Sequence, residues 1–393
     1  MAEVAELIEM DNSEGLGEKI MLVVVTLMSI GTIFVFSAGV DVAKGINLEK
    51  FYESANLRKV LFFPLSVAVM LVLSRIDYRR FSMRRGLLRS PITYIFIISV
   101  ILLVIVLLPQ VGAEINQARR WLRIPLGPVT ISFQPSEFAK WVVIFSLAGF
   151  CVKFNQRLKS FWRGLLPVCL VVGAVVGLVI IEDFGSAALI ALLSFFVLLV
   201  GGANWKYLLA PLPVAAVGFV LAVLASPTRK MRILAFLHPD QWAGSANYQA
   251  SQSLIAIGSG GLWGKGLGMG VCKYGHLPED TTDFIFAIIG EELGFVGSAV
   301  VIALFIAFIV LGILVVRRCE EPFGKLLATS IVLAIGVQAA LNIGVVTVVL
   351  PTKGLPLPFV SAGGTSMLLS AAAVGVLLNI ASQAGRMNFR NDD

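Results

Sequence analysis

A short acidic motif stands directly before one of the long apolar segments of the chain. It reads Leu-Pro-Glu-Asp-Thr-Thr-Asp-Phe and ends with Asp283 and Phe284. Thr and Asp at such a position often cap the first turn of a helix, and that structural explanation stays open. A helix N-terminus favours the ionised carboxylate, whereas neighbouring aromatic rings and a lipid surface disfavour it. Because these effects oppose each other, the pKa of the carboxyl group could lie near neutral, where a carboxylate can act as a general base. Asp283 is therefore the catalytic candidate.

A second group of charged residues occurs earlier in the chain. Three arginines flank Trp121, namely Arg119, Arg120 and Arg123. Guanidinium groups suit an anion such as pyrophosphate, although anchoring at a membrane interface is an equal alternative. Glu137 and Lys140 follow, three residues apart, and therefore share one face of a helix. Charges at membrane depth indicate either a functional pathway or a structural pair, and both interpretations stay open.

The glycine-rich run 258–270 resembles a phosphate-binding loop only superficially. A Walker loop needs Gly-Lys followed by Ser or Thr, but Gly264 and Lys265 are followed by Gly266. The run is either a backbone that can approach a ligand closely or a plain flexible loop.

Metal and redox chemistry have little support in the sequence. The chain has four cysteines and two histidines, and no two cysteines form a CxxC pair. Zinc sites, iron–sulfur sites and disulfide frameworks are therefore disfavoured. No cofactor is predicted, although a divalent cation could assist an anionic group.

The elements that must position these residues are membrane helices. Of the 393 residues, 58% are hydrophobic and 14% are charged, and the mean hydropathy is +0.90. A soluble domain is closer to half apolar and a quarter charged, so this composition excludes a water-soluble fold. A span needs about 20 apolar residues. The sequence therefore predicts an all-α polytopic membrane protein with about ten helices, at Ile20–Gly39, Val60–Leu73, Pro91–Leu108, Pro135–Val152, Leu165–Ile181, Gly185–Gly201, Tyr207–Ala225, Val296–Val316, Leu326–Leu350 and Thr365–Ile380.

Basic residues predict the orientation of this bundle. The densest cluster comprises Arg75, Arg79, Arg80, Arg84, Arg85 and Arg89. The positive-inside rule places this cluster and both termini in the cytoplasm. We expect an acidic cytoplasmic tail at 1–19, one membrane domain at 20–384 and a cytoplasmic tail at 385–393.

One long loop, 226–283, is expected on the extracytoplasmic side between the seventh and eighth helices. Loops of this length are usually functional or disordered, and its aromatic residues favour function. The shorter segments 109–133 and 351–364 emerge on the same face, so three chemically rich segments converge outside the membrane.

Read together, these segments resemble the SEDS family of FtsW and RodA. No single motif establishes the resemblance, but the motifs occur in the same order as in the family, among ten predicted helices. The matching motifs lie at 116–122, 134–140, 183–186, 248–254, 258–270, 277–286, 290–294 and 351–364. The Pro-Thr-Lys-Gly motif at 351–354 resembles the division branch of the family more than the elongation branch.

The resemblance implies a peptidoglycan glycosyltransferase of the cytoplasmic membrane, acting at the division septum. It would polymerise lipid II and release undecaprenyl pyrophosphate, with a class B penicillin-binding protein transpeptidase and other divisome proteins as partners and no nucleic acid. Asp283 would be the catalytic acid–base residue, and Arg120 and Lys140 would contact the leaving group. The matched motifs supply further substrate-binding candidates, namely Glu137, Gln134, Asp183, Gln252, Ser253, Lys265, Glu279, Lys353 and Ser361.

The sequence departs from the family pattern at four places. Thr281 stands where the family usually has His, Glu182 stands before Asp183 where Pro is usual, and Gln117 and Val348 replace common glycines. Two other functions remain open from the sequence. One is a flippase or transporter for the lipid-linked precursor, for which we find no internal repeat, and the other is a non-catalytic scaffold for a transpeptidase.

Overall fold

A computed structural model describes residues 15–39, 54–84, 86–115, 118–126, 129–239, 247–272, 282–352 and 354–391. Its elements, in chain order, are α2 (Leu16–Gly39), α4 (Ser54–Ser74), η2 (Tyr78–Phe81), α5 (Pro91–Val106), β1 (Gly112–Ile115), β2 (Ala118–Leu126), β3 (Val129–Phe133), α6 (Pro135–Lys153), α7 (Asn155–Leu158), η3 (Phe161–Leu165), α8 (Leu166–Ile180), α9 (Phe184–Val200), α10 (Trp205–Leu208), α11 (Leu212–Leu224), α12 (Pro227–Leu237), α13 (Tyr248–Gly260), α14 (Ile285–Arg318), α15 (Pro322–Val346) and α16 (Gly364–Asn391).

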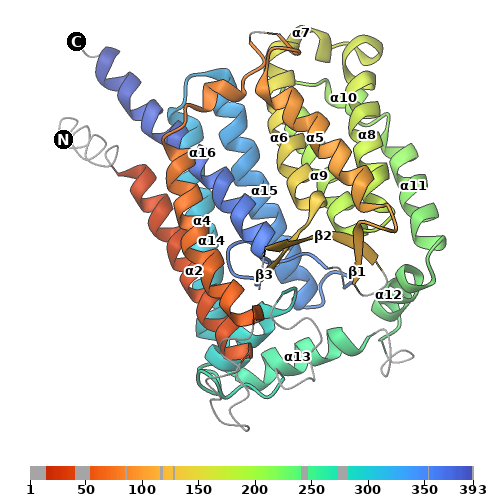
Figure 1. Cartoon of the computed structure of the whole chain (residues 1–393), viewed down its shortest axis with the longest axis vertical. Helices are drawn as coiled ribbons and strands as arrows, with labels where there is room; N and C mark the ends of the chain where they lie inside the picture. Colours follow the sequence, from red (N-terminus) through yellow and green to blue (C-terminus); the bar gives the residue numbers. More distant parts are fainter. Residues whose placement is uncertain are drawn as a thin grey trace.

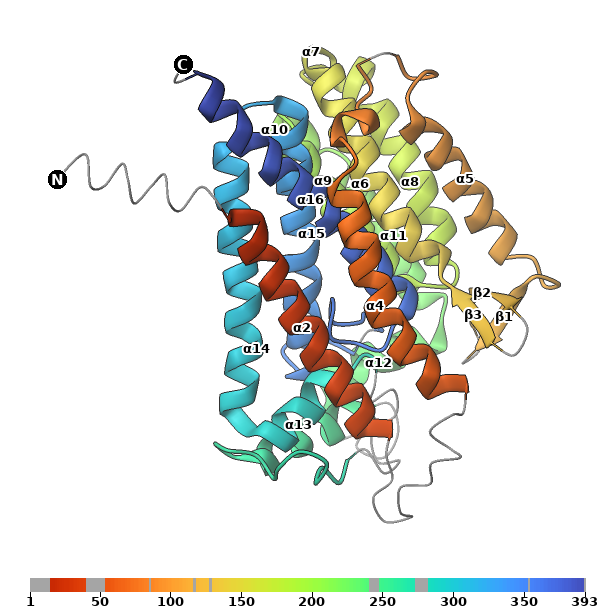
Figure 2. The same cartoon turned by 60° about the vertical axis from the view of Figure 1, so that its left-hand side comes forward.

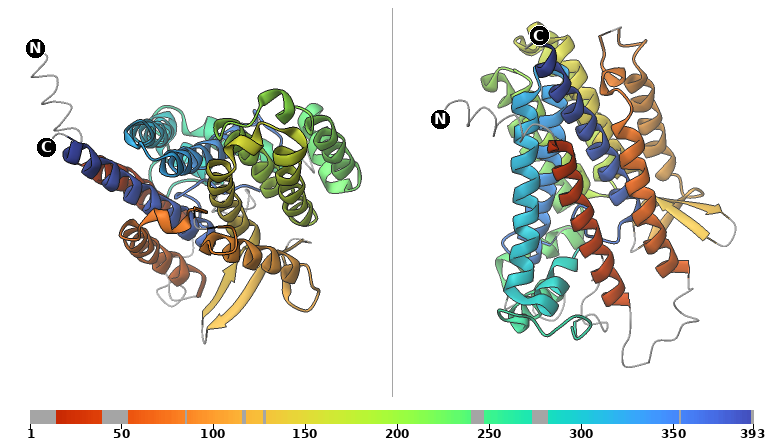
Figure 3. Two further views of the ribbon diagram at one scale, coloured as in Figure 1. Left: turned by 90° about the horizontal axis from the view of Figure 1, so that it is seen from above. Right: turned by 90° about the vertical axis from the view of Figure 1, so that its left-hand side faces the viewer.

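Apolar helices form the body of the molecule (Figure 1). In the described part of the chain, seven helices are long and apolar enough to span a membrane, and three shorter apolar helices lie at 61–74, 91–106 and 184–200. Each overlaps one of the predicted spans, so the prediction of a multi-pass membrane protein is confirmed. Helix α14, however, begins at Ile285 and not at the predicted Val296, and the predicted loop 226–283 contains the helices α12 and α13. The most apolar window of α6 is 78% buried and that of the α10–α11 span only 11%. Thus α6 lies in the interior, as the view from above shows, and α11 lies at the edge (Figure 3).

Local sequence signals set where the helices begin. Proline occupies the first turn of α5, α6, α8, α12 and α15, where its missing N–H costs no helical hydrogen bond. Helix α9 begins after Asp183, whose side chain accepts a hydrogen bond of 3.0 Å from the backbone N–H of Ser186. This cap satisfies one of the donors that a helix start leaves unpaired.

Helix α2 begins and α16 ends at the same end of the bundle, which also carries α7 (Figure 1). This arrangement agrees with termini on one side of the membrane. Helix α16 continues to Asn391, so most of the tail predicted at 385–393 is a helical extension.

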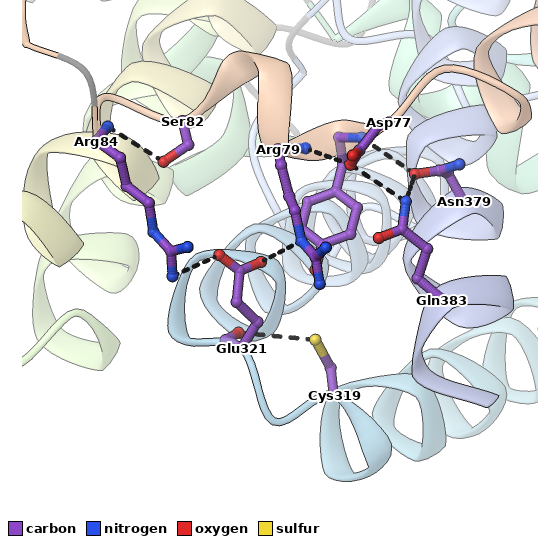
Figure 4. A network of polar contacts seen from close by, with 9 residues as sticks. Asp77, Arg79, Ser82, Arg84, Cys319, Glu321, Asn379 and Gln383 are labelled. Atoms are coloured by element: carbon purple, nitrogen blue, oxygen red, sulfur yellow. Dashed lines mark hydrogen bonds and ion pairs between the residues drawn. The ribbon is translucent and has the colours of Figure 1, made fainter. Parts of the chain in front are cut away.

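A polar network ties the helices together at that same end (Figure 4). Glu321, before α15, pairs with Arg84 at 3.0 Å and with Arg79 at 3.7 Å. Asn379 on α16 accepts a hydrogen bond from the backbone N–H of Tyr78 at 3.0 Å and donates one to the carbonyl of Ser74 at 2.8 Å. The arginines thus hold η2 against the start of α15 in addition to any role in orientation, and the bonds to Asn379 hold it against α16.

The opposite end carries a small antiparallel sheet of order β1-β2-β3, which extends to one side of the bundle (Figure 2). Trp121 pairs with Ala113, and Arg123 pairs with Ser132. From the sequence, the segment 109–133 is expected to be a loop, and the sheet shows this prediction to be wrong. Its β-branched and aromatic residues nevertheless suit strands.

Two buried glutamates hold the glycine-rich run against α14. Glu291 accepts hydrogen bonds from Lys265 Nζ at 2.7 Å and from the backbone N–H of Val271 at 2.9 Å. Glu292 accepts from Ser37 at 2.8 Å and from the backbone N–H of Gly268 at 3.0 Å. These bonds compensate for burying the carboxylates, and they make this run part of the scaffold.

Val348 adopts a left-handed backbone conformation, with φ of 57°. A left-handed conformation costs an L-residue roughly 1–2 kcal/mol, and a β-branched side chain makes it a genuine outlier. The position is one of those at which the family commonly has Gly. We expect Val348→Gly to stabilise the fold by about 1 kcal/mol, measured by thermal unfolding in detergent, after allowing for the greater chain entropy of glycine. Val348→Ala keeps a Cβ and should gain less; equal gains would contradict the backbone explanation.

Candidate active site

A cavity of about 300 Å³ opens at the end of the bundle that carries the sheet. It lies between the start of α9, helix α12 and the segment that follows α15. Three arginines line it, Arg120 from β2 and Arg229 and Arg232 from α12, together with the carboxylates Glu182 and Asp183. Residues far apart in the sequence thus contribute to one polar chamber.

The carboxylates of the cavity are already engaged by protein donors. Asp183 Oδ2 accepts hydrogen bonds from Gln134 at 3.0 Å and from Ser136 at 3.1 Å, while Oδ1 caps α9. Glu182 accepts a bond of 2.7 Å from the backbone N–H of Arg119. These contacts fix the sheet and α6 against the start of α9, so Asp183 and Gln134 shape the wall of the cavity.

The three guanidinium groups crowd positive charge into this space. Burial lowers the pKa of Arg229 and of Arg232, and the charge of Arg120 lowers both further. Arg120 also has a buried Nε for which the described residues provide no hydrogen-bond partner. Because guanidinium groups stay protonated in proteins, the crowding means that a bound anion would be stabilised here.

Arg229 also anchors α12. Its guanidinium donates to the carbonyls of Ile180 at 2.8 Å and Ala222 at 3.1 Å, and it lies 5.2 Å from the centre of the Phe184 ring. Arg229 therefore fixes the position from which Arg232, one helical turn further along, reaches the cavity.

Asp283 lies beside this cavity, two residues before α14 begins. A Cβ added at Gly354, which lines the cavity, would lie 3.0 Å from Asp283 Oδ2 and 3.9 Å from Arg120 Nη1. The Asp283 carboxylate and the Arg120 guanidinium thus approach the same backbone position. Glycine at 354 leaves space between them.

Buried side chains hold the backbone of this segment. Asn342 on α15 donates to the carbonyl of Asp283 at 2.8 Å and to that of Leu355 at 2.7 Å. Ser361 donates to the carbonyl of Thr282 and accepts from the backbone N–H of Leu357 at 2.7 Å. Both side chains are buried. The carboxylate of Asp283 is therefore carried on a backbone that two separate elements fix in place.

Lys140 and Glu137 form a buried pair inside the bundle. Lys140 Nζ lies 2.8 Å from Glu137 Oε2 and 2.7 Å from Gln338 Oε1, and each charged side chain is 1% exposed. Gln338 in turn donates to the carbonyl of Pro356 at 2.9 Å. Neither charged residue lines the arginine cavity. The geometry favours the structural alternative, in which the pair supports the segment after α15.

Three further candidates lie on or beside α13. Ser253 is buried and donates to the carbonyl of Val346 at 2.7 Å, and Gln252 beside it is half-buried. Lys265 pairs with Glu291, away from the lining of the arginine cavity. These residues position the outer loop and are not brought together with Asp283. Glu279 and Lys353 lie outside the described residues.

Arg229, Arg232 and Asn342 belong to the site but do not stand out in the sequence. The two arginines sit three apart in a short helix of the outer loop, where solvated basic residues are common. The spacing of three residues, which places both side chains on one face of a helix, was the signal that could have identified them. For Asn342 the signal was an amide within an otherwise apolar helix, because polar groups at membrane depth usually have a function or a partner.

No group of three or more His, Cys, Asp or Glu residues that could hold a metal ion is present in the described part of the chain. The cavity offers two carboxylates, and both have protein partners. The donor set of this cavity therefore suits an anion better than a cation.

Known proteins resemble the chain over nearly its whole length. The model of the family described as cell cycle protein FtsW/RodA/SpoVE matches residues 18–386. A probable peptidoglycan glycosyltransferase FtsW from Trichlorobacter lovleyi is 37% identical, with 92% of each chain covered. One from Coxiella burnetii is 36% identical, over 92% of this chain and 95% of its own length.

Solved structures share the fold. The rod shape determining protein RodA of Thermus thermophilus matches with a TM-score of 0.62 at 25% identity, over 93% of this chain and 96% of its own. A chain from a peptidoglycan synthase complex matches with a TM-score of 0.70 at 24% identity, over 93% and 97%. By its sequence, its motifs and its fold, the chain belongs to the FtsW, RodA and SpoVE family of cell cycle proteins, which is the SEDS family.

Proposed function

We propose that the chain is a peptidoglycan glycosyltransferase that polymerises lipid II into glycan strands and releases undecaprenyl pyrophosphate. The observation that carries this proposal is a fixed carboxylate, Asp283, beside a cavity lined by three arginines. A base next to an anion site is what transfer from a sugar pyrophosphate requires. Relatives named as peptidoglycan glycosyltransferases, 36–37% identical over most of the chain, support the same reaction.

Asp283 serves as the general base in this proposal. It takes the proton of the acceptor 4-hydroxyl as the hydroxyl oxygen forms a bond to the anomeric carbon of the donor. The bond between that carbon and the phosphate oxygen breaks, and its electron pair leaves with the pyrophosphate. Attack from the face opposite the leaving group inverts the anomeric carbon. The pyrophosphate linkage supplies the driving force, so no ATP is needed.

The arginine cavity binds the pyrophosphate. Negative charge grows on the leaving oxygen as the bond breaks, and donors already oriented toward that charge stabilise it without reorganisation. Arg120 is placed for direct contact because it lines the cavity. Arg229 and Arg232 add charge from α12. We place Lys140 and Glu137 behind the site, as support for the segment that carries Gly354.

The proposed setting is the cytoplasmic membrane at the division septum. Curated relatives carry the division name FtsW, and this supports the septal role. We also propose a class B penicillin-binding protein as partner, because the fold is shared with a chain from a peptidoglycan synthase complex that coordinates polymerization and crosslinking. Other divisome membrane proteins are expected partners as well.

A polymerisation assay tests the function. Purified chain with its transpeptidase partner and labelled lipid II should yield glycan polymer. Movement of lipid II across liposomes without any polymer would instead support a flippase. A transporter site is expected near the membrane midplane, whereas the arginine cavity lies at one end of the bundle. Polymer formation that needs only the partner would support the scaffold alternative.

Asn342 should matter more for activity than an equivalent buried amide elsewhere. Asn342→Ala removes the two hydrogen bonds that the amide donates to the carbonyls of Asp283 and Leu355, at about 0.5–1.5 kcal/mol for each bond. We expect a lower melting temperature and a loss of polymerising activity of about tenfold or more, because the backbone of Asp283 is released. Asn379→Ala is the matched control, since the buried amide of Asn379 donates one hydrogen bond and accepts two at the other end. It should lose stability and keep activity; equal losses of activity would contradict the positioning role.

A further inference from the structure

A second cavity, of about 240 Å³, lies next to the Asp283 segment and is lined by other residues than the arginine cavity. Its lining differs in character, because none of its side chains carries a charge. The residues that matter are aromatic, small or hydroxyl-bearing, namely Phe62, Trp121, Thr282, Ser361, Gly364 and Met367. Such a lining suits a neutral ligand with an apolar face and a few hydroxyl groups.

The two cavities share one wall, and neighbouring residues in that wall serve different cavities. On β2, Arg120 lines the arginine cavity and Trp121 lines the second one. Successive side chains of a strand point to opposite faces, so the strand itself separates the two spaces. Along the segment after α15, Gly354 lines the arginine cavity and Ser361 the second.

Asp283 lies at this shared wall, which we call the partition. Thr282, the residue before it, lines the second cavity, while the Asp283 carboxylate approaches Gly354 on the arginine side. A base that takes a proton from one substrate during attack on another must lie between the two. The partition offers that position, with an anion site on one side and a neutral site on the other.

We infer that the second cavity receives the terminal sugar of the acceptor, with Trp121 as the surface on which the sugar ring packs. The inference rests on the proposed function. The acceptor hydroxyl sits on the sugar farthest from the acceptor's own pyrophosphate, so the group that enters is neutral. At 240 Å³ the cavity is smaller than typical sites for whole ligands of about 300–1,000 Å³, and therefore fits one end of a larger substrate.

The arrangement also explains the direction of attack. With the donor pyrophosphate among the arginines, the anomeric carbon of the donor faces the partition. The acceptor sugar approaches from the second cavity, on the side opposite the leaving group. Asp283 then meets the acceptor hydroxyl where the two sugars touch.

Two substrate analogues allow the donor and the acceptor to be varied separately. A lipid-linked disaccharide that lacks the 4-hydroxyl can act only as donor. One whose sugar–phosphate oxygen is replaced by a methylene group can act only as acceptor. The two analogues can react with each other only once. Measuring the rate of this reaction with the full chain and its transpeptidase partner, while one analogue is varied at a time, gives a Michaelis constant (KM) for each.

Trp121→Leu should raise the KM for the acceptor about tenfold, while the KM for the donor stays within about twofold. Trp121→Phe keeps an aromatic face and should restore most of the affinity. Trp263→Leu is the matched control, because Trp263 is 78% exposed and lines neither cavity. It should change neither constant.

If Trp121→Leu fails to fold, as shown by its melting temperature, Gly364→Ala replaces it. A Cβ at Gly364 would lie 2.7 Å from the Phe62 ring, so the added methyl group narrows the cavity. The inference would be overturned if the KM for the donor rose as much as the KM for the acceptor, or if the KM for the acceptor were unchanged in the folded variants. Absence of coupling by the unmodified protein would instead overturn the proposed function.

Discussion

Replacing Asp283 with asparagine should reduce glycan polymerisation by about 10²–10⁴-fold, because a positioned general base typically contributes that much. The substitution keeps the shape of the side chain and the backbone bonds that Asn342 and Ser361 make to this segment. It removes the negative charge that interacts with Arg232 and, with that charge, the ability to take a proton. The loss should therefore fall on kcat in a polymerisation assay with labelled lipid II, with little change in melting temperature or in lipid II binding.

Two further variants make this result specific. Asp283→Glu keeps a base but moves it by one methylene group, so partial activity is expected. Asp77→Asn changes the same group in the network at the other end of the bundle, where Asp77 binds Gln383 at 3.1 Å. That variant should polymerise normally. Full activity of Asp283→Asn would show that the carboxylate is not the base.

Replacing Arg120 with glutamine should cost about 10²–10³-fold in kcat, the range seen when one donor to a developing negative charge is removed. Arg120 is chosen because it lines the cavity from β2, apart from the two arginines of α12. The substitution leaves Arg229 and Arg232 in place, so binding of the donor should weaken less than turnover. Arg120→Lys keeps the charge without the planar fork and should recover only part of the rate.

Arg123 provides the control for this prediction. It lies on the same strand, is exposed, and does not line the arginine cavity. Arg123→Gln makes the same change in net charge and should leave kcat nearly unchanged. Equal losses for both variants would point to a general effect of charge at the membrane surface.

The membrane body could be predicted from the sequence because span length and apolar composition are local properties. Each apolar run of sufficient length became a helix, and proline or a capping residue set the start of several of them, such as α6 and α9. Asp283 could be singled out for the same reason, since its motif immediately precedes α14. Whether Asp283 caps a helix or acts as a base still depends on the variants above.

The composition of the cavity could not be predicted, because it depends on contacts between distant segments. Arg232 and Arg120 meet only when α12 folds back toward β2, and no local pattern encodes that approach. For Lys140 the reverse holds, because the sequence singled it out but it does not line the cavity. Its charge suggested a ligand, but Glu137 and Gln338 occupy its ammonium group in the interior. A charged residue in an apolar helix thus indicates a partner without saying whether that partner is a substrate.

The position of Asp283 relative to a bound acceptor tests the central claim most directly. The measurement is a structure of the Asp283→Asn variant with its transpeptidase partner, trapped with a donor and an acceptor. We predict the acceptor 4-hydroxyl within about 2.6–3.2 Å of the side chain at 283, with the pyrophosphate among the arginines on the far side of the anomeric carbon. A hydroxyl beyond the reach of that side chain and of one bridging water, or a pyrophosphate bound at residue 283 itself, would contradict the account.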